Sequence, residues 1–108
     1  MASFLWQRKN VEHIDEHVVT PEEAAFVVVN ARPPYPEYLG HGKFRVRGQT
    51  EEGRYLQVIY LFAVDANDIQ WDQVDLSRTD PDDPDLFYVI HAMELSDREK
   101  RRYRRRIK

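Results

Sequence analysis

Three stretches of the chain carry the strand signals. In residues 43–49, Phe44 and Val46 alternate with Lys43, Arg45 and Arg47, which predicts a half-buried strand with three cations on its exposed side. Residues 54–64 are largely apolar on both sides, as is typical of a central strand covered on both faces. Residues 86–94 form the third main strand, expected beside 54–64. A hairpin turn over 50–53 joins the first two strands.

Helical spacing predicts two helices near the start of the chain. The first covers residues 7–17 and should turn Val11, Ile14 and Val18 towards the core. The second runs from about 20 to 30 and begins at a capping box formed by Thr20 and Glu23. Its side chains are apolar almost all round, so it must be buried under a sheet or against the first helix.

A third helix is predicted at the end of the chain, after a capping box of Ser96 and Glu99. Tyr103 and Ile107 lie four residues apart and form a narrow docking face. Almost every other position of this helix is basic.

The remaining segments are expected to be short or irregular. Residues 3–6 form a short edge strand, and residues 35–42 form a loop after a proline-rich stretch. Residues 65–85 contain eight aspartates and two prolines, which indicates an acidic surface insertion packed down by Trp71. The predicted architecture is one α+β domain over residues 1–108: a short N-terminal strand, two helices, a three-stranded antiparallel sheet and a basic C-terminal helix.

Composition narrows the class of protein. A chain of 108 residues with 42% hydrophobic content supports one modest core. The absence of cysteine excludes disulfides and thiolate zinc sites. No apolar run approaches the length of a membrane span and no signal-peptide pattern is present, so we expect a cytoplasmic protein that has no membrane partner.

Charge is distributed unevenly along the chain. Residues 96–108 hold eight Lys or Arg against two acidic residues, whereas the whole chain has a formal net charge of −3. A cationic arm on an acidic body favours an anionic polymer such as nucleic acid, an acidic protein, or the acidic body itself as its partner.

Two groups of polar side chains are candidates for chemistry. Trp6, Asn10, His13 and His17 form a stripe beside the apolar face of the first helix; the stripe either borders the core or presents imidazoles to phosphate as acid and base. A metal held by His13 and His17 is a third alternative, although no HExxH pattern is present. The cations of 43–49 form either a solvated face or a phosphate-contacting surface. The aspartates of 65–85 are of the kind that binds divalent cations, but they lack EF-hand spacing.

Several motifs, taken in order, resemble the BrnT family of toxins. They are Phe4-Leu-Trp6, the stretch from Asn10 to His17, Val19-Thr-Pro-Glu-Glu-Ala24, the stretch from Gly48 to Val58, Val89-Ile-His-Ala92, and Ser96-Asp-Arg-Glu-Lys-Arg-Arg-Tyr103. The resemblance runs from end to end apart from residues 65–85, which are longer here than the expected turn.

The resemblance implies a RelE-like ribonuclease fold and a toxin of a type II toxin–antitoxin system. The implied hydrolase inhibits translation by cleaving RNA without a metal or other cofactor. It needs a proton acceptor, a proton donor and cations for phosphate. The candidate catalytic residues are His91, Lys43, Arg54, His13 and His17. The candidate RNA-binding residues are Arg45, Arg47, Lys100, Arg101, Arg102 and Arg104.

The same resemblance implies a protein partner, a ribbon-helix-helix antitoxin similar to BrnA, and either a homodimer or a toxin–antitoxin heterotetramer. The last strand of the family usually ends in Ala-Arg, whereas this chain has Ala92-Met93. Met93 favours an alternative in which the chain binds RNA or antitoxin with weakened turnover. A non-enzymatic interaction domain that uses its basic helix is a further alternative.

Overall fold

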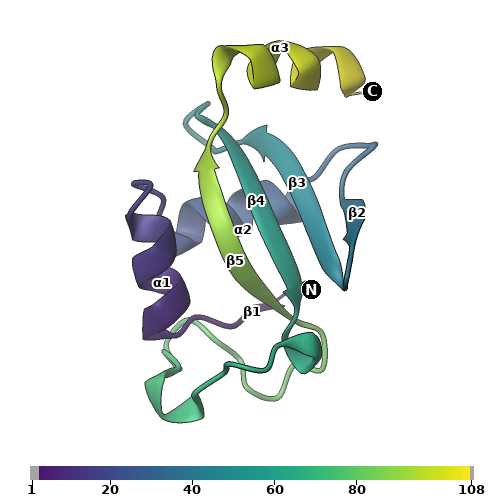
Figure 1. The fold of residues 1–108 in the computed structure, drawn as a ribbon. Coiled ribbons are helices and arrows are strands. Elements are labelled where there is room, and N and C mark those ends of the chain that lie inside the picture. Colours follow the sequence, from purple (N-terminus) through teal and green to yellow (C-terminus); the bar gives the residue numbers. More distant parts are fainter. Residues whose placement is uncertain (1–2, 108) are drawn as a thin grey trace.

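The computed structural model describes residues 3–107 as an α+β fold built on one mixed five-stranded sheet (Figure 1). The strands lie in the order β1-β5-β4-β3-β2; β1 runs parallel to β5 and the other pairs are antiparallel. The main elements are β1 (Ser3–Phe4), α1 (Arg8–Asp15), α2 (Pro21–Val29), β2 (Glu37–Gly40), β3 (Lys43–Gln49), β4 (Tyr55–Phe62), β5 (Leu86–Glu94) and α3 (Asp97–Arg106).

The α+β class, the central position of β4 and the β3–β4 hairpin are confirmed. The short N-terminal edge strand is confirmed as β1, whereas the expected three-stranded antiparallel sheet is too small, because β1 and β2 both join it. The predicted loop over 35–42 contains β2, which folds back on β3 through a tight turn. Gly40 and Gly42 have φ angles of 88° and 76° there, a conformation that glycine adopts without strain.

Helix α2 covers one face of the sheet, here called the inner face (Figure 1). Val27 from α2 and Val46 and Val58 from the strands belong to this core and are buried. Helix α1 lies along β5 on the side of the sheet where β1 is too short to pair with the whole strand. Among residues 3–107, no helix covers the middle of the opposite face, here called the outer face (Figure 1).

The end of α1 differs from the prediction. The helix stops at Asp15, and Val18 adopts a left-handed φ of 57° with 74% of its surface exposed. The chain therefore buries Val19 in place of Val18. Helical spacing could not predict this exchange, since the helix has ended before either residue.

Both predicted capping boxes are confirmed. The backbone N–H of Glu23 donates to the Thr20 hydroxyl at 3.1 Å, and that of Thr20 donates to the Glu23 carboxylate at 3.0 Å. Ser96 and Glu99 exchange the same pair of bonds at 3.2 and 2.8 Å. Both helices therefore begin where the sequence predicts.

The acidic segment 65–85 is more than a surface insertion. Ile69 and Val74 pack into a second, smaller core, which covers one end of the outer face around Leu61 and Tyr88. The buried Thr79 hydroxyl accepts a hydrogen bond from the backbone N–H of Trp6 at 3.0 Å. Trp71, the residue expected to hold the segment down, is 53% exposed, so that expectation is wrong.

Helix α3 lies across the other end of the sheet, away from the acidic segment (Figure 1). Tyr103 is buried against Tyr35 and Tyr55, and Ile107 packs on the same core, which confirms the predicted docking face. The alternative that α3 docks on the aspartates of residues 65–85 is therefore wrong. In the described part of the chain no helix is long and apolar enough to cross a membrane.

Candidate functional site

Three imidazoles from distant parts of the sequence meet at the border of the outer face. The ring centroid of His91 on β5 lies 5.5 Å from that of His17 and 6.1 Å from that of His13. The rings of His13 and His17 are 6.2 Å apart. His91 and His17 are half-buried, while the side chain of His13 is 46% exposed. The three rings are called the histidine cluster below.

A bulge in β5 turns His91 towards this cluster. Ile59 of β4 pairs with His91 and Tyr60 pairs with Val89, so Ile90 is an extra residue in the strand. Simple alternation would place His91 on the same face as Val89, inside the main core. The bulge reverses that alternation, so that His91 and Met93 share the outer face with Tyr88.

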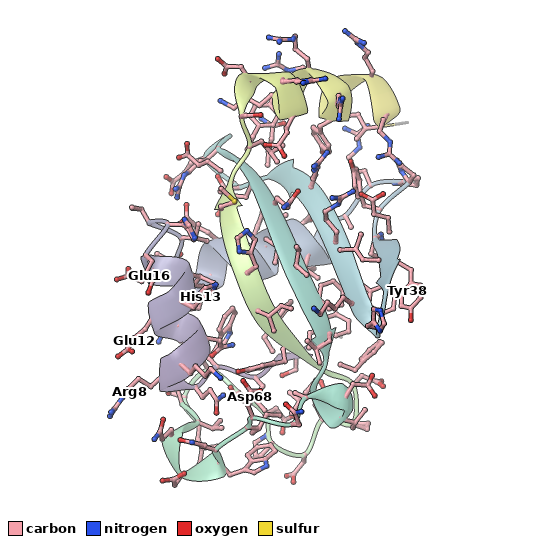
Figure 2. The ribbon with its side chains drawn as sticks, in the orientation of Figure 1. Arg8, Glu12, His13, Glu16, Tyr38 and Asp68 are labelled. Atoms are coloured by element: carbon pink, nitrogen blue, oxygen red, sulfur yellow. The ribbon has the colours of Figure 1, made fainter. Side chains whose placement is uncertain are left out.

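Buried amides fix α1 beside β5 and so place His13. The Asn10 side chain donates to the carbonyl oxygens of Leu5 and Val89, at 3.0 and 3.2 Å. The Gln7 side chain donates to the Tyr88 hydroxyl at 2.8 Å. Figure 2 shows His13 directed from α1 towards the sheet, whereas Arg8 and Glu12 project away from it.

Arg54 holds the chain segment that follows α1. Its guanidinium donates to the Val18 carbonyl at 2.7 Å and lies 3.5 Å from the His17 carbonyl. It also pairs with the carboxylates of Glu94 at 2.6 Å and Glu23 at 3.2 Å. The structure thus places Arg54 behind the histidine cluster, with its donors engaged by the protein.

Hydrogen bonding lowers the pKa of one of these partners. Burial alone raises the pKa of Glu23, but hydrogen bonds from Thr20 and Arg54 outweigh that effect and leave the pKa below its ordinary value. Glu23 therefore stays ionised to a lower pH than an ordinary glutamate does.

The cations of β3 are not a free row. Arg47 is only 8% exposed and bonds to Gln57 at 2.9 Å and to Glu99 at 3.2 Å, so the expectation that it faces solvent is wrong. Arg45 is half-buried and pairs with Glu37 at 2.7 Å. These carboxylates offset the like charges, which is why β3 tolerates them.

The predicted phosphate-binding residues of β3 differ in their distance from the cluster. Arg45 lies in the same cross-strand row as Ile59 and His91, two strands away from the cluster. Lys43 is exposed, but it lies in the row of Leu61 and Tyr88, nearer the second core. The structure brings His13, His17 and His91 together and leaves Lys43 apart.

Two of the predicted cations of α3, Lys100 and Arg104, lie at the end of the outer face of the sheet. The Arg104 guanidinium carbon lies 5.1 Å from the ring centroid of Tyr55, and Lys100 Nζ lies 5.7 Å from it. Arg101 and Arg102 are exposed on the outer side of the helix. Tyr55, which sequence reasoning did not connect with α3, is therefore the contact that positions these two cations.

Two open hollows flank the histidine cluster. One of about 550 Å³ lies along α1 and includes His13, Arg8, Lys9 and Tyr88 in its lining. The other, of about 530 Å³, is lined by His17, Val18, Arg54, Met93 and Glu94. The histidine cluster thus lies between two hollows that are open to solvent.

Acid–base chemistry is the chemistry that this arrangement supports. Burial lowers the pKa of His91, and the neighbouring His17 and His13 lower it further, so the ring is neutral near pH 7. Across residues 3–107, no group of three or more His, Asp or Glu side chains is placed so that it could hold a metal ion.

Gln57 is a residue that sequence reasoning missed. It lies between Arg47 and Met93 in one cross-strand row of the outer face. The sequence does show an amide at an outward-facing position of an otherwise apolar strand. Its neighbours in the row are identified only once the strand register is known.

Comparisons of the chain with family models, with curated proteins and with solved structures gave no match. The resemblance to BrnT toxins therefore rests on the sequence motifs given above.

Proposed function

We propose that this chain is a metal-independent ribonuclease of the RelE-like type, similar to BrnT toxins and acting in the cytoplasm to inhibit translation. The observation that carries the proposal is the meeting of His13, His17 and His91 at the outer face. Neighbouring imidazoles, with ring centroids 5.5–6.2 Å apart here, can supply both a proton acceptor and a proton donor near neutral pH.

The proposed reaction is transesterification within the RNA chain. Neutral His91 accepts the proton of a ribose 2′-OH while that oxygen attacks the adjacent phosphorus. A protonated imidazole, either His13 on α1 or His17 in the turn after it, gives its proton to the departing 5′-oxygen. The products are a 2′,3′-cyclic phosphate and a free 5′-OH, and no external oxidant or metal is needed.

Cations for the phosphate come from two directions. Arg45 lies on β3, two strands from the cluster, and shares its charge with Glu37. Lys100 and Arg104 lie on α3, over the ring of Tyr55. Arg54 supports the site by holding the His17 carbonyl rather than by binding phosphate.

A second candidate function is binding without efficient turnover. Met93 lies on the outer face beside the histidine cluster and is 37% exposed. An arginine at this position would add a charge-assisted donor beside the transition state. With methionine there, the chain retains its cationic surface but has one fewer group to stabilise the phosphorane.

The decisive experiment is an RNA cleavage assay in EDTA with a 5′-labelled single strand. We expect cleavage that ends in a 2′,3′-cyclic phosphate, and a decrease of about 100-fold or more in His91→Ala. His41→Asn is the matched control, because it removes an exposed histidine far from the cluster and asparagine tolerates the left-handed φ of 53°. Equal rates in His91→Ala and the parent would reject the mechanism.

Met93→Arg separates turnover from binding. If the parent binds RNA without cutting it and only Met93→Arg cuts, the second candidate function holds. Co-expression with the adjacent reading frame tests the proposed antitoxin, which should be a small ribbon-helix-helix protein that restores growth. The same complex would show whether the assembly is a homodimer or a heterotetramer.

A further inference from the structure

The end of the molecule opposite α3 holds an apolar hollow of about 440 Å³ at the edge of the second core. Val64, Ile69, Trp71, Pro84 and Leu86 contribute to its lining. This volume falls within the range of pockets that accept a small ligand or one large side chain.

Apolar side chains at this hollow are unusually exposed. Val64 is 83% exposed and Trp71 is 53% exposed, although the lining residues Ala63 and Leu86 are buried in the second core. Large apolar groups left in water next to a hollow are typical of an interaction site.

The charge around the hollow shows what kind of partner it fits. Asp83 lines it, and Asp65, Asp72, Asp82 and Asp85 directly follow or precede lining residues in the sequence. Within residues 3–107 none of these five carboxylates has a Lys, Arg or His within ion-pairing distance. A cation placed here would gain Coulomb energy without having to break an existing pair.

We propose that this hollow is a docking site for a protein segment that carries one large apolar side chain flanked by lysines or arginines. The apolar side chain fills the space beside Val64 and Trp71, and the cations meet the carboxylates around it. The site lies away from the histidine cluster, so the inference does not depend on the proposed ribonuclease activity.

Other occupants fit less well. Nucleic acid would be repelled by the carboxylates. The α3 helix of a second copy has the right charge, but its exposed side chains are all charged or polar, and none of them can fill an apolar hollow. The charge and the hollow together therefore favour a mixed basic and apolar segment.

The test is fluorescence anisotropy with a labelled nine-residue peptide that has a central leucine and lysines on both sides. We expect saturable binding that is weakened about 10-fold or more when the leucine is replaced by serine, since the hydroxyl cannot replace the apolar surface that the leucine buries. A peptide with glutamates in place of the lysines should not bind. A blue shift of the emission of exposed Trp71 should accompany binding, because Trp6 is already buried.

Matched variants place the peptide on the hollow. Val64→Ser should weaken binding about fivefold or more, whereas Val29→Ser, at a valine on α2 that is 58% exposed, should not. Asp83→Asn should also weaken binding, with Glu52→Gln in the β3–β4 hairpin as the control. Thermal unfolding verifies that each variant is folded.

Three outcomes would overturn the proposal. The first is equal affinity for the leucine and serine peptides, which would show general attraction to aspartates. The second is unchanged binding in Val64→Ser. The third is concentration-dependent self-association that Val64→Ser abolishes, which would make a second copy the occupant.

Discussion

Arg54 links three segments of the chain beside the histidine cluster. Replacing it with methionine should lower the free energy of unfolding by about 2–4 kcal/mol, because two carboxylates and a carbonyl lose their shared donor. Urea unfolding measures this loss. Arg54→Lys should recover only part of it, since an ammonium cannot reproduce the planar fork.

The control for Arg54 is Arg98→Met, which removes an exposed arginine of α3. If both variants unfold at the same urea concentration, Arg54 contributes no more than a surface charge. Its position behind the cluster would then have no structural consequence.

The pH dependence of stability follows from the environment of His91. Burial and the neighbouring His17 and His13 lower its pKa from an ordinary value of 6.5. The unfolded chain therefore binds a proton at this residue when the folded chain does not. The contribution of neutral His91 to stability is present above its ordinary pKa, and it is lost as the pH falls from that value through the lower pKa of the folded state.

Urea unfolding at about pH 7.5 and pH 5 measures this dependence. We expect the free energy of unfolding of His91→Asn to change less between the two pH values than that of the parent. His41→Asn, which removes a histidine outside the cluster, is the reference. Equal changes in the two variants would contradict the assignment.

At the scale of elements, much of the fold could be predicted because local signals agree with it. The Thr20 and Ser96 caps fix two helix starts, and the period of two in residues 43–49 fixes β3. The strand β2 could not be predicted, since its four residues gain their order from pairing with β3. Pairing is a long-range interaction that local pattern does not contain.

The candidate site could be predicted only in part for the same reason. Sequence reasoning selected His13, His17 and His91, and the structure brings them together. The sequence could not show that a bulge at Ile90 places His91 on the outer face. Nor could it show that Arg47 forms an ion pair with Glu99. Both depend on partners that are distant in the sequence.

Helix α3 depends on tertiary contacts, because its basic residues repel one another at i, i+4 spacing. Tyr103 provides the main buried contact. Tyr103→Ala should detach the helix and lower stability by about 3–4 kcal/mol, within the range for removal of a buried aromatic side chain.

Limited trypsin digestion measures the detachment of α3, with cleavage expected within residues 97–106. Arg102→Ala is the control, since it alters an exposed side chain of the same helix. Protection of α3 in Tyr103→Ala equal to that in the control would show that other contacts suffice.

At the scale of the whole molecule, the position of a cation should decide its effect on the proposed RNA binding. Lys100→Gln with Arg104→Gln should weaken RNA binding and reduce its salt dependence, because both side chains lie at the end of the outer face. Arg102→Gln with Arg105→Gln removes the same charge from the exposed side and should have the smaller effect. Affinity measured at several salt concentrations distinguishes the two, and equal slopes would reject a specific role.

The separation of α3 from the acidic segment also affects how the protein meets a polyanion. The two lie at opposite ends of a molecule whose longest dimension is 42 Å, which gives it a large electric dipole. An RNA strand would attract the α3 end and repel the other before any contact is made. The α3 end would therefore meet the RNA first. The acidic end would point away from the RNA and stay free for a second partner.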